Sequence, residues 1–175
     1  MKTILISFSP EETKKIGKKL AKKLIKRQKK AQVLSLEGEL GGGKTTFLKG
    51  LAKGVGIEVL IRSPSFVIMK KYKLEGRKRK VESGKRELKV KSGKKFKKST
   101  SHFPLPTFYH FDCYRVQKSR EIISLGWKEI TSNPKNIVAV EWGNRIKNIL
   151  PQDHIQIRFE FLDEYKRRIT IANLY

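Results

Sequence analysis

Apolar residues occur along this chain in two kinds of pattern, and the two alternate. Segments 3–8 and 31–37 are apolar runs of strand length, whereas residues 10–30 repeat apolar positions at intervals of three and four. That interval predicts an amphipathic helix with one buried stripe. The stripe comprises Ile16, Leu20, Ala21, Leu24 and Ile25. Lysines fill most other positions, and such a run is usually a solvated face unless it binds a polyanion.

The alternation continues in the second half of the chain. Residues 47–55 predict a helix, and residues 108–115 alternate aromatic and polar groups as a half-buried strand does. A short helix broken near Gly126 is predicted over 121–130. Residues 136–142 form an apolar run typical of a strand buried in a parallel sheet.

Two further strands are predicted near the C-terminus, at 155–162 and 168–172, around the polar turn Asp163-Glu164. The element order predicts the α/β class: a three-layer, P-loop NTPase-like domain with a mixed, mainly parallel central sheet, flanking helices and a C-terminal antiparallel hairpin. With 175 residues, 38% of them apolar, the chain is long enough for one such domain over 1–175 and too short for two.

Residues 75–98 interrupt this pattern, because they are rich in lysine and arginine and offer few apolar side chains. With its C-terminal flank the segment extends over 75–106. We interpret it as a basic insertion or flexible hairpin within the domain. It is either a docking site for a phosphate backbone or a tolerated surface insertion, and the sequence favours neither.

The clearest chemical signal lies at 38–46, where the sequence fits the phosphate-binding pattern G-x-x-x-x-G-K-[ST]. Glycines let successive backbone N–H groups turn toward an anion. Lys44 would add charge for the β- and γ-phosphates, and the Thr45 hydroxyl could bind Mg²⁺. A strand-length run precedes the loop and a helical pattern follows it, as the motif requires. The predicted nucleotide-binding residues are Gly38, Glu39, Leu40, Gly41, Gly42, Gly43, Lys44, Thr45 and Thr46.

Two carboxylates are candidates for the metal side of this site. A carboxylate at the end of a neighbouring apolar strand lies beside the metal in folds with this loop, which favours Glu141, with Asp112 as the rival. A solvent-facing glutamate is equally compatible with the spacing. Pro64 keeps Ser63 extended. Ser63 and Ser65 therefore belong either to a segment that senses the γ-phosphate or to an ordinary strand start.

The chain is strongly basic, with 41 Lys and Arg against 16 Asp and Glu and a formal net charge of +25. This excess favours a polyanionic partner, nucleic acid first, although adaptation of a whole basic proteome would give the same composition. The single cysteine, Cys113, excludes an internal disulfide. His102, His110 and His154 lack metal-ligand spacing. We therefore interpret these histidines and Cys113 as core or surface residues.

No apolar run approaches the roughly 20 residues that a membrane-spanning helix needs. The apolar run before Pro10 is also too short for a signal peptide. We therefore expect a cytoplasmic protein without a membrane partner.

Five short sequences together resemble the TsaE (YjeE) family in order and spacing. They are Gly-Glu-Leu-Gly-Gly-Gly-Lys-Thr-Thr at 38–46, Ser-Pro-Ser-Phe at 63–66, His-Phe-Asp-Cys-Tyr-Arg at 110–115, Glu-Ile-Ile-Ser-Leu-Gly at 121–126 and Glu-Trp at 141–142. The resemblance covers nearly the whole chain except the basic segment at 75–98.

This resemblance implies a small bacterial ATPase that uses ATP and Mg²⁺ and acts with the TsaB and TsaD subunits. Their joint product is N6-threonylcarbamoyladenosine at position 37 of tRNAs that read codons beginning with A, so tRNA would be nearby through the complex. TsaE proteins are not the transferase, and ATP hydrolysis is thought to reset the assembly.

The resemblance also implies roles for individual residues. Those that would hold Mg²⁺ or assist it are Thr45, Glu141 and Asp112. Lys44 would contact the phosphates, so Lys44, Asp112 and Glu141 are the catalytic candidates. Ser65 would belong to a switch-like segment near the nucleotide, and Trp142 would cover the site beside Glu141. No trans-acting arginine can be assigned, so turnover is expected to be slow without the partners.

Two other functions fit parts of the sequence. One is a P-loop phosphotransferase acting on a small molecule, which would need an acceptor pocket. The other is a basic RNA-binding module with a vestigial P-loop. The guanine-reading [NT]-K-x-D signature is absent from the sequence, which argues against a conventional GTPase.

Overall fold

The computed structural model describes residues 2–25, 30–57, 68–73 and 107–174. Ser63, Ser65 and the basic segment at 75–106 lie outside the described residues. Within them, no helix is long and apolar enough to cross a membrane.

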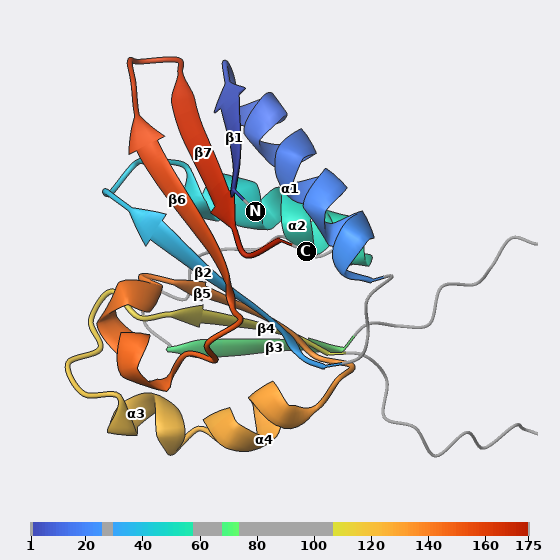
Figure 1. Cartoon of the computed structure of the whole chain (residues 1–175), viewed down its shortest axis with the longest axis vertical. Helices are drawn as coiled ribbons and strands as arrows, with labels where there is room; N and C mark the ends of the chain where they lie inside the picture. Colours follow the sequence, from blue (N-terminus) through green and yellow to red (C-terminus); the bar gives the residue numbers. More distant parts are fainter. Residues whose placement is uncertain (1, 26–29, 58–67, 74–106, 175) are drawn as a thin grey trace, which may run out of the picture.

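Seven strands form one sheet in the described part of the chain, in the order β1-β7-β6-β2-β5-β4-β3 (Figure 1). The strands are β1 (Lys2–Ser7), β2 (Gln32–Gly38), β3 (Met69–Lys73), β4 (Thr107–Asp112), β5 (Ile137–Glu141), β6 (Ile155–Phe161) and β7 (Arg167–Ala172). The helices are α1 (Pro10–Leu24), α2 (Lys44–Val55), α3 (Arg120–Ile123), α4 (Trp127–Ser132) and the 3-10 helix η1 (Gly143–Ile149).

The sheet is mixed, as the sequence predicted, but it is not mainly parallel, because three of its six described strand pairings are parallel and three are antiparallel. Strands β6, β2, β5 and β4 pair in parallel at its centre, whereas β1–β7, β6–β7 and β3–β4 pair antiparallel. The predicted C-terminal hairpin is β6–β7. In its turn the Asp163 carboxylate accepts hydrogen bonds from the backbone N–H groups of Tyr165 and Lys166 at 2.9 and 2.8 Å. A turn this short forces antiparallel pairing, so parallel strands prevail only in the centre.

Helices cover both faces of the sheet and make the expected three layers (Figure 1). On one face α1 and α2 close a core in which the Phe47 and Phe159 rings meet edge to face at 5.4 Å. On the other face α3, α4 and η1 close a second core, where the Phe111 and Trp127 rings lie 5.3 Å apart.

Helix α1 begins as the sequence predicts and ends earlier. The Ser9 hydroxyl accepts the Glu12 N–H at 3.1 Å, while the Glu12 carboxylate accepts the Phe8 N–H at 2.8 Å, a reciprocal capping arrangement. The helix ends at Leu24 rather than near Lys30. The apolar stripe in the sequence stops at Ile25, so tertiary packing no longer supports a longer helix.

Strand β4 is also shorter than predicted, since it ends at Asp112 and not at Arg115. The Asp112 carboxylate accepts a hydrogen bond from the Tyr114 N–H at 3.0 Å. This side chain therefore closes a turn directly after the strand. Helix η1 was not predicted, because its seven residues carry no clear helical repeat of apolar positions.

Helices α1 and α2 approach each other so closely that their contact surface requires glycine. A Cβ atom on Gly17 would lie 2.3 Å from the Phe47 carbonyl oxygen, and one on Gly50 would lie 2.0 Å from the Lys14 carbonyl oxygen. Glycine inside a helix costs roughly 1 kcal/mol relative to alanine. Glycine is nevertheless present at these positions, because a residue with a side chain would keep the two backbones apart.

Replacing Gly50 with alanine should therefore destabilise the protein although alanine is the better helix former. Overpacking against the α1 backbone is expected to lower the free energy of unfolding by about 2 kcal/mol. Chemical denaturation measures the change. Lys49→Ala, at an exposed position of the same helix, is the control and should change stability little. A Gly50→Ala variant more stable than the parent would contradict the close helix contact.

Candidate functional site

The candidate site lies where three parallel strands end. Strand β2 leads into the loop that precedes α2, β5 ends at Glu141 and β4 ends at Asp112. In the sheet register Glu141 lies opposite Leu36 of β2 on one side and Asp112 on the other. Ligands of open α/β sheets bind beyond the carboxyl ends of such strands. The two acidic residues and the glycine-rich loop therefore meet at one edge.

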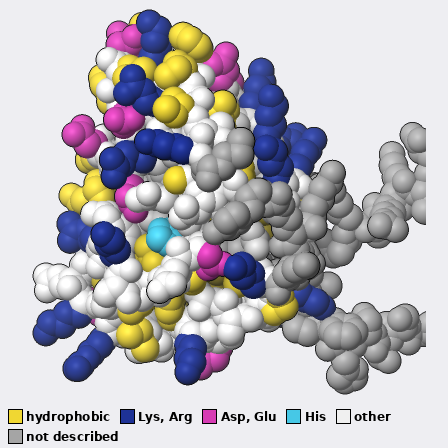
Figure 2. Space-filling model, viewed as in Figure 1, with side chains coloured by type: hydrophobic (Ala, Val, Ile, Leu, Met, Phe, Trp, Pro, Cys, Tyr) yellow, Lys and Arg dark blue, Asp and Glu magenta, His cyan; other side chains and the backbone are white. Residues whose placement is uncertain are grey.

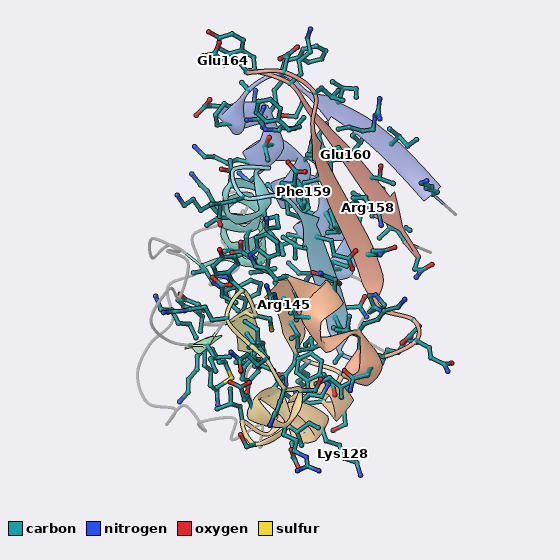
Figure 3. All side chains as sticks on the ribbon, turned by 90° about the vertical axis from the view of Figure 1, so that its left-hand side faces the viewer. Lys128, Arg145, Arg158, Phe159, Glu160 and Glu164 are labelled. Carbon is teal, nitrogen blue, oxygen red and sulfur yellow. The ribbon has the colours of Figure 1, made fainter. Side chains whose placement is uncertain are left out.

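The path of the loop depends on glycine at both ends. Gly38 has φ of 136°, and a Cβ atom there would lie 2.3 Å from the carbonyl oxygen of Phe159, which is labelled in Figure 3. Gly43, directly before α2, has φ of 101°. Residues with a side chain rarely adopt these angles. The glycines of the motif are thus required by the backbone itself, and they direct the first turn of α2 toward the end of β5.

Lys44 is buried within this loop. Its Nζ donates hydrogen bonds to the carbonyl oxygens of Gly38 at 2.8 Å and Glu39 at 2.7 Å. The same atom lies 4.0 Å from the centre of the Trp142 ring, a cation–π distance. Burial lowers the pKa of Lys44, and the nearby Glu141 and Asp112 carboxylates oppose that shift. The site therefore holds a desolvated ammonium group beside two acidic side chains.

The Thr45 hydroxyl and the Glu141 carboxylate are in direct contact. Thr45 Oγ1 donates to the two carboxylate oxygens, at 3.2 Å to Oε1 and 2.9 Å to Oε2. Glu141 is only 3% exposed. This contact joins the start of α2 to the end of β5. The structure thus brings together two of the three residues expected to surround a metal.

His110 is a part of this site that the sequence reasoning missed. Its Nε2 lies 3.0 Å from Glu141 Oε1, and its side chain is fully buried. An ionised carboxylate only accepts hydrogen bonds, so Nε2 is the donor in that state of Glu141. Within the described residues Nδ1 has no hydrogen-bond partner. The signal lay in the His-x-Asp spacing, because residues two apart on β4 share one face of the sheet.

Asp112 lies beside Glu141 in the sheet but is less buried. One of its carboxylate oxygens accepts the Tyr114 N–H, as described above. In the described part of the chain, no group of three or more His, Cys, Asp or Glu side chains could hold a metal ion. A cation at this edge would therefore depend on the Thr45 hydroxyl and on ligand oxygens as well as on the carboxylates.

Trp142 follows Glu141 in a conformation that is rare for a bulky residue, with φ of 60° and ψ of 41°. Its N–H donates to the Leu36 carbonyl at 2.9 Å, and its ring lies 5.2 Å from the Tyr114 ring. Backbone strain of this kind persists only where the surroundings fix it. It keeps the indole ring over Lys44.

Arg145 of η1 (labelled in Figure 3) lies at the margin of this group, with its guanidinium carbon 5.9 Å from the centre of the Tyr114 ring. Its backbone N–H donates to the Trp142 carbonyl at 3.0 Å. The sequence reasoning missed Arg145, because η1 itself was not predicted. Among the other predicted residues, Leu40 is 81% exposed at the loop tip, and Ser65 lies outside the described residues.

Cys113 lies directly behind the site. Its N–H donates to the Glu141 carbonyl at 3.0 Å, and its side chain belongs to the second core. Burial raises the pKa of the Cys113 thiol from 9.0 to about 12, with smaller contributions from the Asp112 and Glu121 carboxylates. The thiol is thus an inert core group at neutral pH, as the sequence indicated.

Comparison with known proteins gives consistent matches over most of the chain. A family model described as threonylcarbamoyl adenosine biosynthesis protein TsaE matches residues 7–82 and 86–169. The tRNA threonylcarbamoyladenosine biosynthesis protein TsaE of Bacillus subtilis is 35% identical over 164 residues, covering 94% of this chain and 81% of that protein. Its Rickettsia felis counterpart is 33% identical over 169 residues, covering 96% and 78%.

The fold also has a solved relative. A crystal structure of Bacillus subtilis YdiB superimposes with a TM-score of 0.62 at 28% sequence identity. The match covers 98% of this chain and 84% of that one.

The Cys113 thiol should make stability depend on alkaline pH. The raised pKa means that the native thiol stays protonated where the unfolded thiol ionises. Its stabilising contribution is complete below pH 9.0 and is lost as the pH rises toward about 12. The loss approaches about 1.4 kcal/mol per pH unit. Urea unfolding at neutral pH and within this window, compared between the parent and Cys113→Ala, measures it. Equal pH dependence in both proteins would contradict the assignment.

Proposed function

Since this chain belongs to the TsaE family, we propose that it is a cytoplasmic ATPase that binds ATP with Mg²⁺ at residues 38–46. It would act with TsaB and TsaD in the threonylcarbamoylation of adenosine 37 in tRNAs that read codons beginning with A. Its own turnover would be slow without these partners.

The observation that carries this proposal is the 2.9 Å contact between the Thr45 hydroxyl and the Glu141 carboxylate. Hydroxyl and carboxylate oxygens are hard ligands of the kind that Mg²⁺ prefers, together with substrate phosphates. These residues fit such an ion, and Asp112 is the adjacent carboxylate. When bound, Mg²⁺ would neutralise charge on the β- and γ-phosphate oxygens.

Lys44 would stabilise the negative charge that develops during phosphoryl transfer. Its ammonium group donates to two loop carbonyls, at 2.8 and 2.7 Å. Exchange of these acceptors for phosphate oxygens keeps each donor satisfied and replaces neutral with charged partners, which are stronger. The low exposure of Lys44, 5%, strengthens that interaction.

The surrounding residues would orient the reaction rather than take part in bond changes. His110 would donate a hydrogen bond to Glu141 and so limit the orientation of the Glu141 carboxylate. Asp112 would orient the attacking water. Trp142 would shield Lys44 from bulk water, since its ring lies against Nζ. In-line attack of water on the γ-phosphate needs this kind of positioning more than covalent chemistry.

The direct test of this function is Lys44→Ala, assayed for phosphate release from ATP. Loss of the buried charge should reduce turnover about 10²-fold or more, while circular dichroism shows an intact fold. Lys53→Ala, which removes an exposed lysine from the same helix, is the matched control and should keep full turnover. Retained activity in Lys44→Ala would rule out the proposed site. A small-molecule product that gains phosphate would assign a phosphotransferase instead.

The proposed metal contact makes a separate prediction about Thr45. Thr45→Val keeps the shape of the side chain but removes the hydroxyl, whereas Thr45→Ser keeps the hydroxyl. The Mg²⁺ concentration for half-maximal turnover should rise about tenfold or more in the valine variant. In the serine variant it should stay close to that of the parent. The measurement is a Mg²⁺ titration at saturating ATP. Equal Mg²⁺ requirements for both variants would show that the hydroxyl is not a ligand.

A further inference from the structure

A dense basic surface lies on α1 and α2, apart from the nucleotide site. We call it the lysine face. Its members are Lys14, Lys15, Lys18, Lys19, Lys22, Lys23, Lys49 and Lys53. All are exposed except Lys14, which is partly exposed. The only acidic residues of the two helices are Glu11 and Glu12 in the first turn of α1. In Figure 2 dark blue side chains gather along the edge where Figure 1 places α1.

These charges are almost uncompensated within the protein. In the described part of the chain, the one ion pair that involves the lysine face joins Lys14 to Glu11 at 3.2 Å. Lysines three and four positions apart on a helix repel one another, as Lys15, Lys18 and Lys22 do here. A bound polyanion would remove that repulsion.

The two helices present these lysines as one surface. The glycine contacts described above bring the backbones of α1 and α2 together, and a Cβ atom on Gly54 would lie 2.9 Å from the Lys18 carbonyl oxygen. Lysines of α1 follow each other at intervals of about 5 Å along the helix axis. Their flexible stems let the ammonium groups reach successive phosphates of a strand. The surface is therefore continuous and rigid at its base.

The composition of the lysine face separates the possible partner classes. Exposed large apolar side chains occur on other elements of the described structure and not on α1 or α2. They are Ile4, Ile6, Phe8, Leu40, Tyr114, Ile123, Leu125, Phe161, Leu162 and Tyr165. Protein interfaces depend on aromatic and arginine anchors, and membrane-bound helices on an exposed apolar face. A surface of lysines alone offers only charge, which is what phosphate backbones bind.

We propose that the lysine face binds the phosphate backbone of RNA directly. This contact would not depend on the base sequence of the RNA. It is distinct from the site at 38–46, because Lys44 is buried and does not belong to the lysine face. It would position an RNA against α1 and α2 while the nucleotide site functions separately. The inference does not depend on ATP hydrolysis.

The test measures binding of a full-length tRNA transcript to the whole protein by fluorescence anisotropy over a salt series. The variant carries Lys15→Gln, Lys18→Gln and Lys22→Gln. The matched control carries Lys118→Gln, Lys128→Gln and Lys147→Gln, three exposed lysines in the layer on the opposite side of the sheet (Lys128 in Figure 3). Both proteins lose the same net charge. The lysine-face variant should reduce the slope of log affinity against log salt by about 2, and the control should change it much less.

Each other outcome overturns the proposal. Equal losses in both variants would mean that net charge alone attracts RNA. Absence of binding by the parent at low salt would exclude the contact. Tighter binding of polyglutamate than of the tRNA at equal charge concentration would assign the face to an acidic protein instead. Thermal unfolding checks that the variant is folded. If it is not, Lys19→Gln, Lys23→Gln and Lys49→Gln together provide a second test of the same surface.

Discussion

The candidate site depends on the parallel pairing of β2 with β5, which places the Glu141 carboxylate within hydrogen-bond distance of Thr45. The register of these strands sets where β5 ends relative to the loop after β2. A shift by one residue would turn Glu141 to the other face of the sheet. Such a shift would also move the apolar side chains of a strand from one core into the other, so the packing of both cores opposes it. Core packing thus sets the strand register that brings Thr45 and Glu141 into hydrogen-bond contact.

The same edge of the sheet concentrates buried ionisable groups, which normally destabilise a fold. Lys44, His110 and Glu141 are each 5% exposed or less. Their hydrogen bonds join the loop, β4, β5 and α2, so the cost of burial is offset only when all four elements are in place. The elements are therefore coupled here, since removal of the Glu141 carboxylate would leave the buried His110 side chain without a hydrogen-bond partner in the described residues.

Sequence patterns predicted most of the fold because its elements carry strong local signals. The phosphate-binding motif, the apolar run of β5 and the hairpin around Asp163 each correspond to an element in the structure. What the sequence patterns did not predict were features set by contacts between elements. His110 became a site residue only through the register of β4 with β5, and Arg145 through the turn at Trp142. The end of β4 was missed because a single side chain, that of Asp112, closes the turn.

The hydrogen bonds of Lys44 explain why a buried charge can remain available for a ligand. A lysine paired directly with a buried carboxylate would be held by a strong charged interaction. Lys44 instead donates to two backbone carbonyls, while Glu141 is occupied by Thr45 and His110. Neutral acceptors hold an ammonium group less strongly than an anion does, so a phosphate can displace them without breaking the carboxylate network. The separation of donor and acid within one small site would thus favour reversible binding of an anion.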